Sequence, residues 1–199
     1  MGDAMKNQET SRRISLTSRN TFGKLPWAGI CILTLLMTSA IGAFAQGQME
    51  EHEAKAAFVL RLVNFIQWPA ESGQGPLIIG TVGADETSVA LQRLAAGKPV
   101  NGREIVIRRL AADADLKGYH VLFIGASEAK NTAAILDRAR GVSVLTIGET
   151  DGFGQHGGIV NLSLSDGRIR LEVNPHAAER AHLQLSSRLL SLATLVNGG

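Results

Sequence analysis

The chain has 199 residues with 20 basic and 18 acidic side chains, which give a formal net charge of +2. Five of the basic and two of the acidic residues lie within residues 1–45, so the remaining chain holds 15 basic and 16 acidic residues and is nearly neutral. A nearly neutral chain excludes a nucleic-acid-binding protein of the strongly basic kind. The only cysteine, Cys31, also lies within residues 1–45, which excludes disulfides within the rest of the chain.

Residues 1–45 have the pattern of a secretory signal peptide. Basic residues up to Lys24 precede an apolar run at 27–37, and Ala43-Phe44-Ala45 supplies the small residues of a cleavage site. The run is shorter than the roughly 20 residues that span a bilayer, so an uncleaved anchor is the less favoured interpretation. The pair Arg12-Arg13 leaves twin-arginine export open beside the general secretory route. We therefore expect an exported domain over residues 46–199.

Residues 52–69, HEAKAAFVLRLVNFIQWP, predict the first helix of that domain. At about 100° per residue, an apolar face that includes Phe58, Leu62 and Ile66 lies opposite a polar stripe with Arg61 and Asn64. So broad an apolar face predicts a helix that is mostly covered by protein.

Two residues of this segment bear on its ends. Pro69 disfavours helical geometry at Trp68, so we expect the helix to stop there. Lys55 lies within the apolar face but near the first turn, where its ammonium can reach water along a buried stem.

Strands and helices then alternate along the chain. Short apolar runs predict strands, and longer periodic segments that end near glycines predict helices. The strands are expected at 77–82, 102–110, 119–125 and 142–147, and the helices at 86–96, 113–117 and 127–140. Such alternation is typical of right-handed crossovers and a parallel sheet with helices on both faces.

Residues 159–173, IVNLSLSDGRIRLEV, predict a β-hairpin around Asp166-Gly167. Pairing Ser165 with Arg168 places every apolar residue opposite another apolar residue, whereas a slip by one residue would mix the two faces. The chain then predicts a helix from Asn174-Pro175 to residue 181 and a last amphipathic helix at 183–195. The expected fold is a single α/β domain: a central, mainly parallel sheet flanked by helices on both faces, with a C-terminal antiparallel hairpin and a final helix.

No motif predicts catalysis, a metal or a cofactor. The loop at 80–85 follows a strand but lacks the third glycine of a dinucleotide fingerprint, and an ordinary strand-to-helix turn is favoured over a ligand loop. His176 and His182 are six residues apart and fall on different helical faces, so no metal site is expected. The glycine-rich segment 151–158 is interpreted as a flexible connection into the hairpin rather than a ligand loop.

The candidate partner- or ligand-binding residues are polar or aromatic side chains on predicted exposed faces. Each candidate also has a structural interpretation. The polar hairpin face and the last helix are more often solvated surfaces than binding sites, and Trp68 is more often an aromatic lid on the core than an anchor for a partner. The candidates are Arg61, Asn64, Trp68, Asn161, Arg170, Glu172 and Arg188.

Four pieces of the chain, taken in this order after a signal peptide, resemble the YfiR-like family of exported bacterial regulators. They are residues 55–58 running to 65–69 (KAAF to FIQWP), residues 97–103 (GKPVNGR), residues 119–124 (YHVLFI), and the hairpin with its flanks from 157 to 190. The resemblance covers nearly all of residues 46–199. Members of the family often carry cysteines in the exported domain, and this chain has none there.

The resemblance implies a periplasmic protein without catalytic activity that holds a membrane-bound diguanylate cyclase inactive by binding its periplasmic domain. Such repression limits cyclic-di-GMP and the formation of exopolysaccharide or biofilm. Related domains resemble the input domains of membrane histidine kinases, so a small-ligand sensor is the first alternative, and a homodimer is compatible with either function. A hydrolase that acts through Asp85, Ser127 or His156 is a more distant alternative. We expect no cofactor and no nucleic-acid partner.

Overall fold

The structure is a computed structural model that describes residues 48–72 and 75–198. The expected signal peptide at 1–45 lies outside these residues. Within them, no helix combines the length and apolar character that a membrane crossing requires.

A seven-stranded sheet forms the centre of the domain, in the order β3-β2-β4-β5-β6-β7-β9. Neighbouring strands are parallel except β6 and β7, which pair antiparallel. The strands are β2 (Leu77–Val82), β3 (Ile105–Leu110), β4 (Val121–Ile124), β5 (Leu145–Gly148), β6 (Val160–Ser165), β7 (Arg168–Val173) and β9 (Thr194–Leu195). The predicted central strand at 119–125 is confirmed, since all four residues of β4 are buried between β2 and β5.

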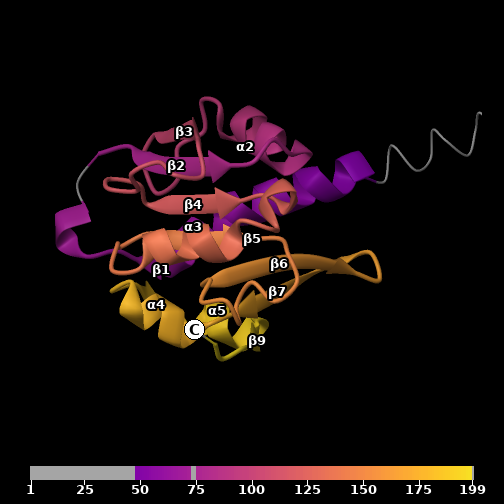
Figure 1. The fold of residues 1–199 in the computed structure, drawn as a ribbon. Helices are drawn as coiled ribbons and strands as arrows, with labels where there is room; N and C mark the ends of the chain where they lie inside the picture. Colours follow the sequence, from indigo (N-terminus) through magenta and orange to yellow (C-terminus); the bar gives the residue numbers. More distant parts are fainter. Residues whose placement is uncertain (1–47, 73–74, 199) are drawn as a thin grey trace, which may run out of the picture. The chain divides into compact units, whose positions relative to one another are not determined.

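Helices cover both faces of this sheet, as the sequence predicts (Figure 1). Buried residues of alternating strand positions, such as Ile79 and Phe123, share one core cluster with Val59 of the N-terminal helix and Leu91 of α2. The opposite positions form a second cluster with α3, which includes Ile135. The helices are the N-terminal helix (described at 48–62), α2 (Glu86–Ala95), α3 (Thr132–Ala139), α4 (Pro175–Arg180) and α5 (Ser187–Leu192), with 3-10 turns at Val63–Phe65, Ala70–Ser72 and Ala126–Glu128.

The hairpin has the predicted register. Ser165 pairs with Arg168, and each pair down to Val160 with Val173 follows. Asp166 and Gly167 have φ values of 55° and 70°, the left-handed geometry of a type I′ turn whose twist matches that of the flanking strands. The local turn and the alternation of side chains therefore agree on one pairing.

The first predicted helix is too long. Its α-helical part ends at residue 62, and β1 (Ile66–Gln67) pairs antiparallel with β8 (Gln184–Leu185). The N–H of Ser186 also donates to the Phe65 carbonyl at 2.9 Å. These bonds join segments that lie far apart in the sequence, so an apolar period within one segment cannot predict them.

The last predicted helix, 183–195, is wrong for the same reason. Only Ser187–Leu192 is helical, and Ser186 caps it by accepting from the Leu189 N–H at 3.2 Å. The flanking residues pair with β1 on one side and with β7 on the other. Two small β-pairings therefore replace the ends of the expected helix.

Two further helix predictions need correction. Residues 113–117 are not helical: turns at 112–113 and 117–118 flank an irregular stretch, and the Lys117 N–H donates to the Asp115 side chain at 3.0 Å. The helix expected at 127–140 is a 3-10 turn followed by α3, which starts at Thr132. Ser127 does not cap it, because its Oγ accepts the N–H of Ala84 from the loop after β2.

Candidate functional site

The predicted binding residues lie in two separate parts of the domain. Arg61 and Asn64 are exposed at the end of the N-terminal helix, which packs on one face of the sheet. Asn161 and Glu172 point to the opposite face, because Asn161 is paired with Gly148 while the neighbouring pair, Ile147 with Val160, belongs to the core under that helix. The two groups therefore form two candidate surfaces.

The hairpin surface is less exposed than a solvated sheet face. Asn161 is 2% exposed, and its Nδ2 donates to Glu172 Oε2 at 3.3 Å. The Asn161 Oδ1 is buried without a hydrogen-bond partner among the described residues. Arg170 is exposed beside them and lies 3.4 Å from Asp166. The structure therefore joins Asn161 to Glu172 and leaves Arg170 at the rim.

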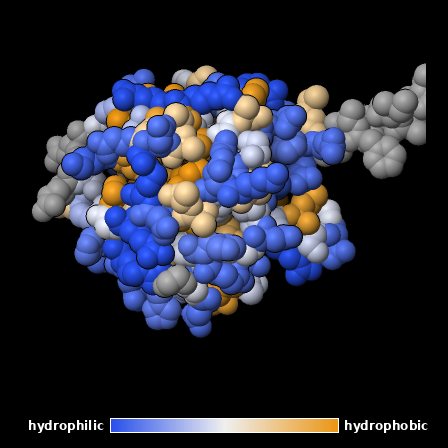
Figure 2. Space-filling model, viewed as in Figure 1, coloured by the Kyte–Doolittle hydropathy of each residue, from blue (hydrophilic) through white to orange (hydrophobic). Residues whose placement is uncertain are grey.

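The other predicted residues differ in exposure. Arg188 is exposed on α5. Asn64 is exposed as well, and its Nδ2 donates to the Arg61 carbonyl at 3.2 Å. Trp68 is only half-exposed and packs as a lid on the core, as its structural alternative predicts. On the face shown in Figure 2, hydrophilic side chains surround small apolar areas, so this face presents no broad apolar docking patch.

Trp68 belongs to a cluster at the amino-terminal ends of β2 and β4. Its indole Nε1 donates to the His120 carbonyl at 3.1 Å, and its ring meets the imidazole edge-on with centroids 6.0 Å apart. Arg103 lies 2.9 Å from His120 Nε2 and donates from its Nε to the Gly75 carbonyl at 2.7 Å. Three sequence pieces that carry the family resemblance therefore meet here, and the cluster ties the segment after the first helix to the sheet.

The sequence analysis missed His120, because its partners are backbone groups and residues far along the chain. Its Nδ1 accepts the Ile78 N–H at 3.1 Å, so the ring proton is assigned to Nε2, which lies 2.8 Å from the Ser72 carbonyl. Burial lowers the pKa of His120, the Ser72 carbonyl opposes that shift, and the charge of Arg103 reinforces it. The imidazole is therefore a neutral structural link.

The lowered pKa of His120 predicts a loss of stability in acid. In the unfolded chain the imidazole titrates near its ordinary value of 6.5, whereas the folded protein resists protonation. The contribution of the neutral imidazole to the free energy of unfolding is complete above pH 6.5 and is lost as the pH falls below that value. We expect the urea midpoint of the wild type to decrease between about pH 7.5 and about pH 5.5, and the decrease to be smaller in His120→Gln. Equal decreases in the two proteins would contradict the assignment.

A second polar cluster holds the N-terminal helix against the carboxyl end of β5. Glu149, whose side chain is 2% exposed, accepts from Lys55 Nζ at 3.2 Å and from Thr87 Oγ1 at 3.2 Å. Its other oxygen accepts the Ala126 N–H at 3.1 Å, and Lys55 also pairs with Glu51 at 2.7 Å. Lys55 is therefore buried in an ion pair rather than extended to water, which corrects the expectation from its helix position.

The residues of the hydrolase alternative have separate structural partners. Asp85 Oδ1 caps α2 by accepting the Ser88 N–H at 2.8 Å, and His156 Nδ1 lies 2.8 Å from the Gly152 carbonyl. No hydrogen bond among the described residues joins Ser127 to His156. Within residues 48–72 and 75–198, no group of three or more His, Cys, Asp or Glu side chains is placed to hold a metal ion.

The segment at 151–158 is anchored rather than a flexible connection. Phe153 at its centre is fully buried, and its ring lies against Gly148 and Gly158. A Cβ atom at either glycine would come within 2.2 Å and 2.1 Å of the ring, respectively. The glycines therefore serve the packing of one aromatic side chain.

The fold has counterparts among solved structures. A conserved domain protein from Vibrio cholerae O1 biovar El Tor aligns with 72% of this chain and 59% of its own, at 15% identity and a TM-score of 0.52, which supports the fold alone. The ABC domain of a Streptococcus pneumoniae protein, solved in complex with L-Trp, aligns with 60% of this chain and 55% of its own, at 6% identity and a TM-score of 0.46. In both cases this chain spans less than two thirds of the solved chain.

Comparison with curated proteins finds no match. A family model described as YfiR/HmsC-like matches residues 52–194, which include the hairpin, α5 and both polar clusters except Glu51. The match covers most of the chain, and all four pieces that carry the resemblance lie within it. The chain therefore belongs to the YfiR/HmsC-like family.

Proposed function

We propose that this protein is a periplasmic, non-enzymatic regulator that binds the periplasmic domain of a membrane-bound diguanylate cyclase and represses it. Repression would limit cyclic-di-GMP and, through it, biofilm or exopolysaccharide formation. The family match over residues 52–194 carries the proposal. The signal-peptide pattern at 1–45 supports export, with residues 46–199 as the exported regulatory domain.

Deletion of the gene in its host tests this function directly. Loss of a repressor releases the cyclase, so we expect cellular cyclic-di-GMP and biofilm mass to rise. Complementation with the wild-type gene restores the low level, whereas an unchanged level after deletion would contradict the proposal. Cross-linking in the same host should recover a membrane protein with a diguanylate cyclase domain.

The exposed end of the N-terminal helix is the partner surface that we favour. Arg61 and Asn64 are exposed there. Asn64 bonds to the Arg61 backbone carbonyl, and the Arg61 guanidinium makes no hydrogen bond to another described residue. Arg170 and Glu172 of the hairpin form the competing surface, and Arg188 is exposed separately on α5, which packs through Leu189 on the core cluster under the N-terminal helix. A guanidinium at the edge of an interface contributes to partner choice and association rate more than to folding.

We therefore expect Arg61→Ala to keep the wild-type melting temperature and to raise cyclic-di-GMP toward the deletion level. Arg108→Ala is the matched control, because Arg108 is also exposed but lies on β3 at an edge of the sheet. A folded Arg61→Ala protein that represses normally would move the interface to the hairpin, where Arg170→Ala is the next variant to test.

A further inference from the structure

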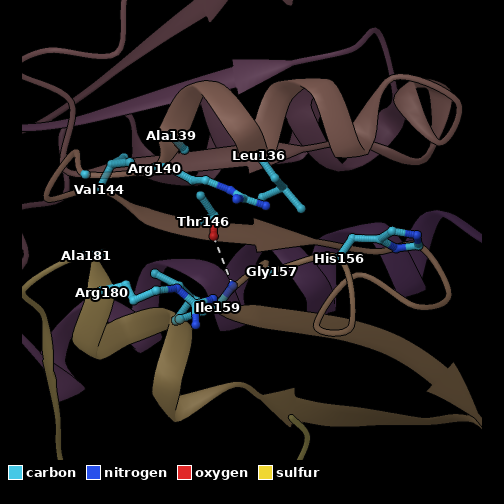
Figure 3. Close-up of a pocket in the computed structure, with 12 residues that line it drawn as sticks. Leu136, Ala139, Arg140, Val144, Thr146, His156, Gly157, Ile159, Arg180 and Ala181 are labelled. Carbon is cyan, nitrogen blue, oxygen red and sulfur yellow. Dashed lines mark hydrogen bonds between the residues drawn. The ribbon is translucent and has the colours of Figure 1, made fainter. Parts of the chain in front are cut away.

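A cavity of about 350 Å³ lies between α3 and α4, away from both polar clusters (Figure 3). Its floor is apolar and buried: Val144, Ile159, Leu136 and Ala177 are each at most 5% exposed. The volume falls in the range of about 300–1,000 Å³ that is typical of sites for small ligands. The floor therefore offers a binding surface to a small apolar group.

Two arginines stand over this apolar floor from opposite walls. Figure 3 shows Arg140 on the side of α3 and Arg180 on the side of α4, with Thr146 between them and His156 at one end of the cavity. Thr146 Oγ1 accepts the Ile159 N–H at 3.0 Å, and the Arg180 Nη2 donates to the Gly198 carbonyl at 3.5 Å. The remaining N–H groups of the two guanidiniums are charged donors of the lining. The arginines come from different helices, and the tertiary fold alone brings them to one cavity.

The ordinary explanation for both arginines is their position at the C-terminal end of a helix, Arg140 directly after α3 and Arg180 in the last turn of α4. A cation there is stabilised by the helix dipole, and Arg140 also lies 3.0 Å from Asp137. That explanation accounts for one arginine on each helix but not for their placement over a shared apolar floor. Because water is displaced from such a floor, a positive rim strengthens the attraction for a bound anion.

We propose that this cavity binds a small organic anion, with its apolar body on the Val144–Ile159 floor and its carboxylate between Arg140 and Arg180. Arginine suits this task because its planar donors match the two oxygens of a carboxylate. His156 adds a further polar group at the end of the cavity. The site does not depend on the proposed repression of a cyclase, and its test measures binding alone.

Titration of the purified protein with benzoate, followed by ligand-observed NMR and calorimetry, tests the site. Benzamide keeps the ring without the charge, and acetate keeps the charge without the ring. We expect saturable binding of benzoate and at least about tenfold weaker binding of either control. Benzamide loses a charge-assisted hydrogen bond, which corresponds to about a factor of ten. Acetate loses the apolar ring that would be buried on the floor, which is worth at least as much. Equal affinities for benzoate and benzamide, or no saturation by benzoate, would overturn the proposal.

Substitutions locate the anion. Arg140→Gln and Arg180→Gln should each weaken benzoate binding by about tenfold with unchanged melting temperatures, because both arginines are exposed. Arg168→Gln, an exposed arginine of the hairpin outside the cavity lining, should leave the affinity unchanged. Affinities that are the same in all three variants would assign benzoate to another part of the surface and reject this site.

Discussion

Replacing Glu149 with leucine is expected to destabilise the protein by about 3 kcal/mol or more, as removal of one member of a buried ion pair does. The substitution leaves the buried Lys55 ammonium with Glu51 alone, and it removes the acceptor for Thr87 and for the Ala126 N–H. Chemical unfolding followed by circular dichroism measures the change. The loss should appear as a lower midpoint of the unfolding curve.

A double variant separates the ion pair from simple packing. Lys55→Met with Glu149→Leu removes both charges and keeps similar volumes, so we expect it to be more stable than Glu149→Leu alone. Glu53→Ala is the control, because Glu53 pairs with Arg93 at the exposed surface and such pairs contribute about 0–1 kcal/mol. Similar losses in Glu149→Leu and Glu53→Ala would contradict a buried pair.

The same pair predicts a dependence on alkaline pH. Burial disfavours the charged ammonium of Lys55, but Glu51 and Glu149 outweigh that effect and raise its pKa above the ordinary 10.5. A raised lysine pKa contributes stability that is complete below 10.5 and is lost as the pH rises through the folded value. The wild type should therefore lose more stability than Lys55→Met above that pH, while both keep theirs near neutrality.

Truncation of Phe153 is the second large effect that we expect. Phe153→Ala removes a fully buried ring from the core between the sheet and α3, and such truncations cost about 3–5 kcal/mol. Thermal unfolding should show the loss. Phe153→Leu keeps most of the volume and should cost clearly less.

The glycines beside this ring provide an independent check. Gly148→Ala places a methyl group against the Phe153 ring, and overpacking of this kind costs about 1–3 kcal/mol. In the Phe153→Ala background the space is open, so the same substitution should cost much less. Additive losses would show that the ring does not occupy the position between Gly148 and Gly158.

The residues that carry the family resemblance and the residues proposed to contact a partner have different roles in the structure. The pieces that carry the resemblance around Trp68, Arg103 and His120 have structural partners, so their presence in the pattern follows from the fold. The candidate contacts with a partner, Arg61 and Asn64, are exposed and make few bonds of their own. Loss of repression without loss of folding is therefore expected from exposed candidates such as Arg61 and Asn64, and not from Trp68, Arg103 or His120.

The sequence by itself determined the elements whose signals are local. The hairpin pairs as predicted because Asp166-Gly167 favours one turn, and the alternation of Leu162, Leu164 and their partners allows one register. The strand at 77–82 and the start of α4 at Asn174-Pro175 follow from an apolar run and a helix cap in the same way. In each case the residues that decide the structure are neighbours in the chain.

Only the tertiary structure decided which distant groups meet. Lys55 and Glu149 are 94 residues apart, and the Trp68 indole donates to a carbonyl 52 residues along the chain. The pairing of β1 with β8 ended a helix that its own residues would have continued, because those backbone groups bond to another segment. A periodic pattern states which face of an element is buried, but it contains no information on the identity of the residue that packs against it.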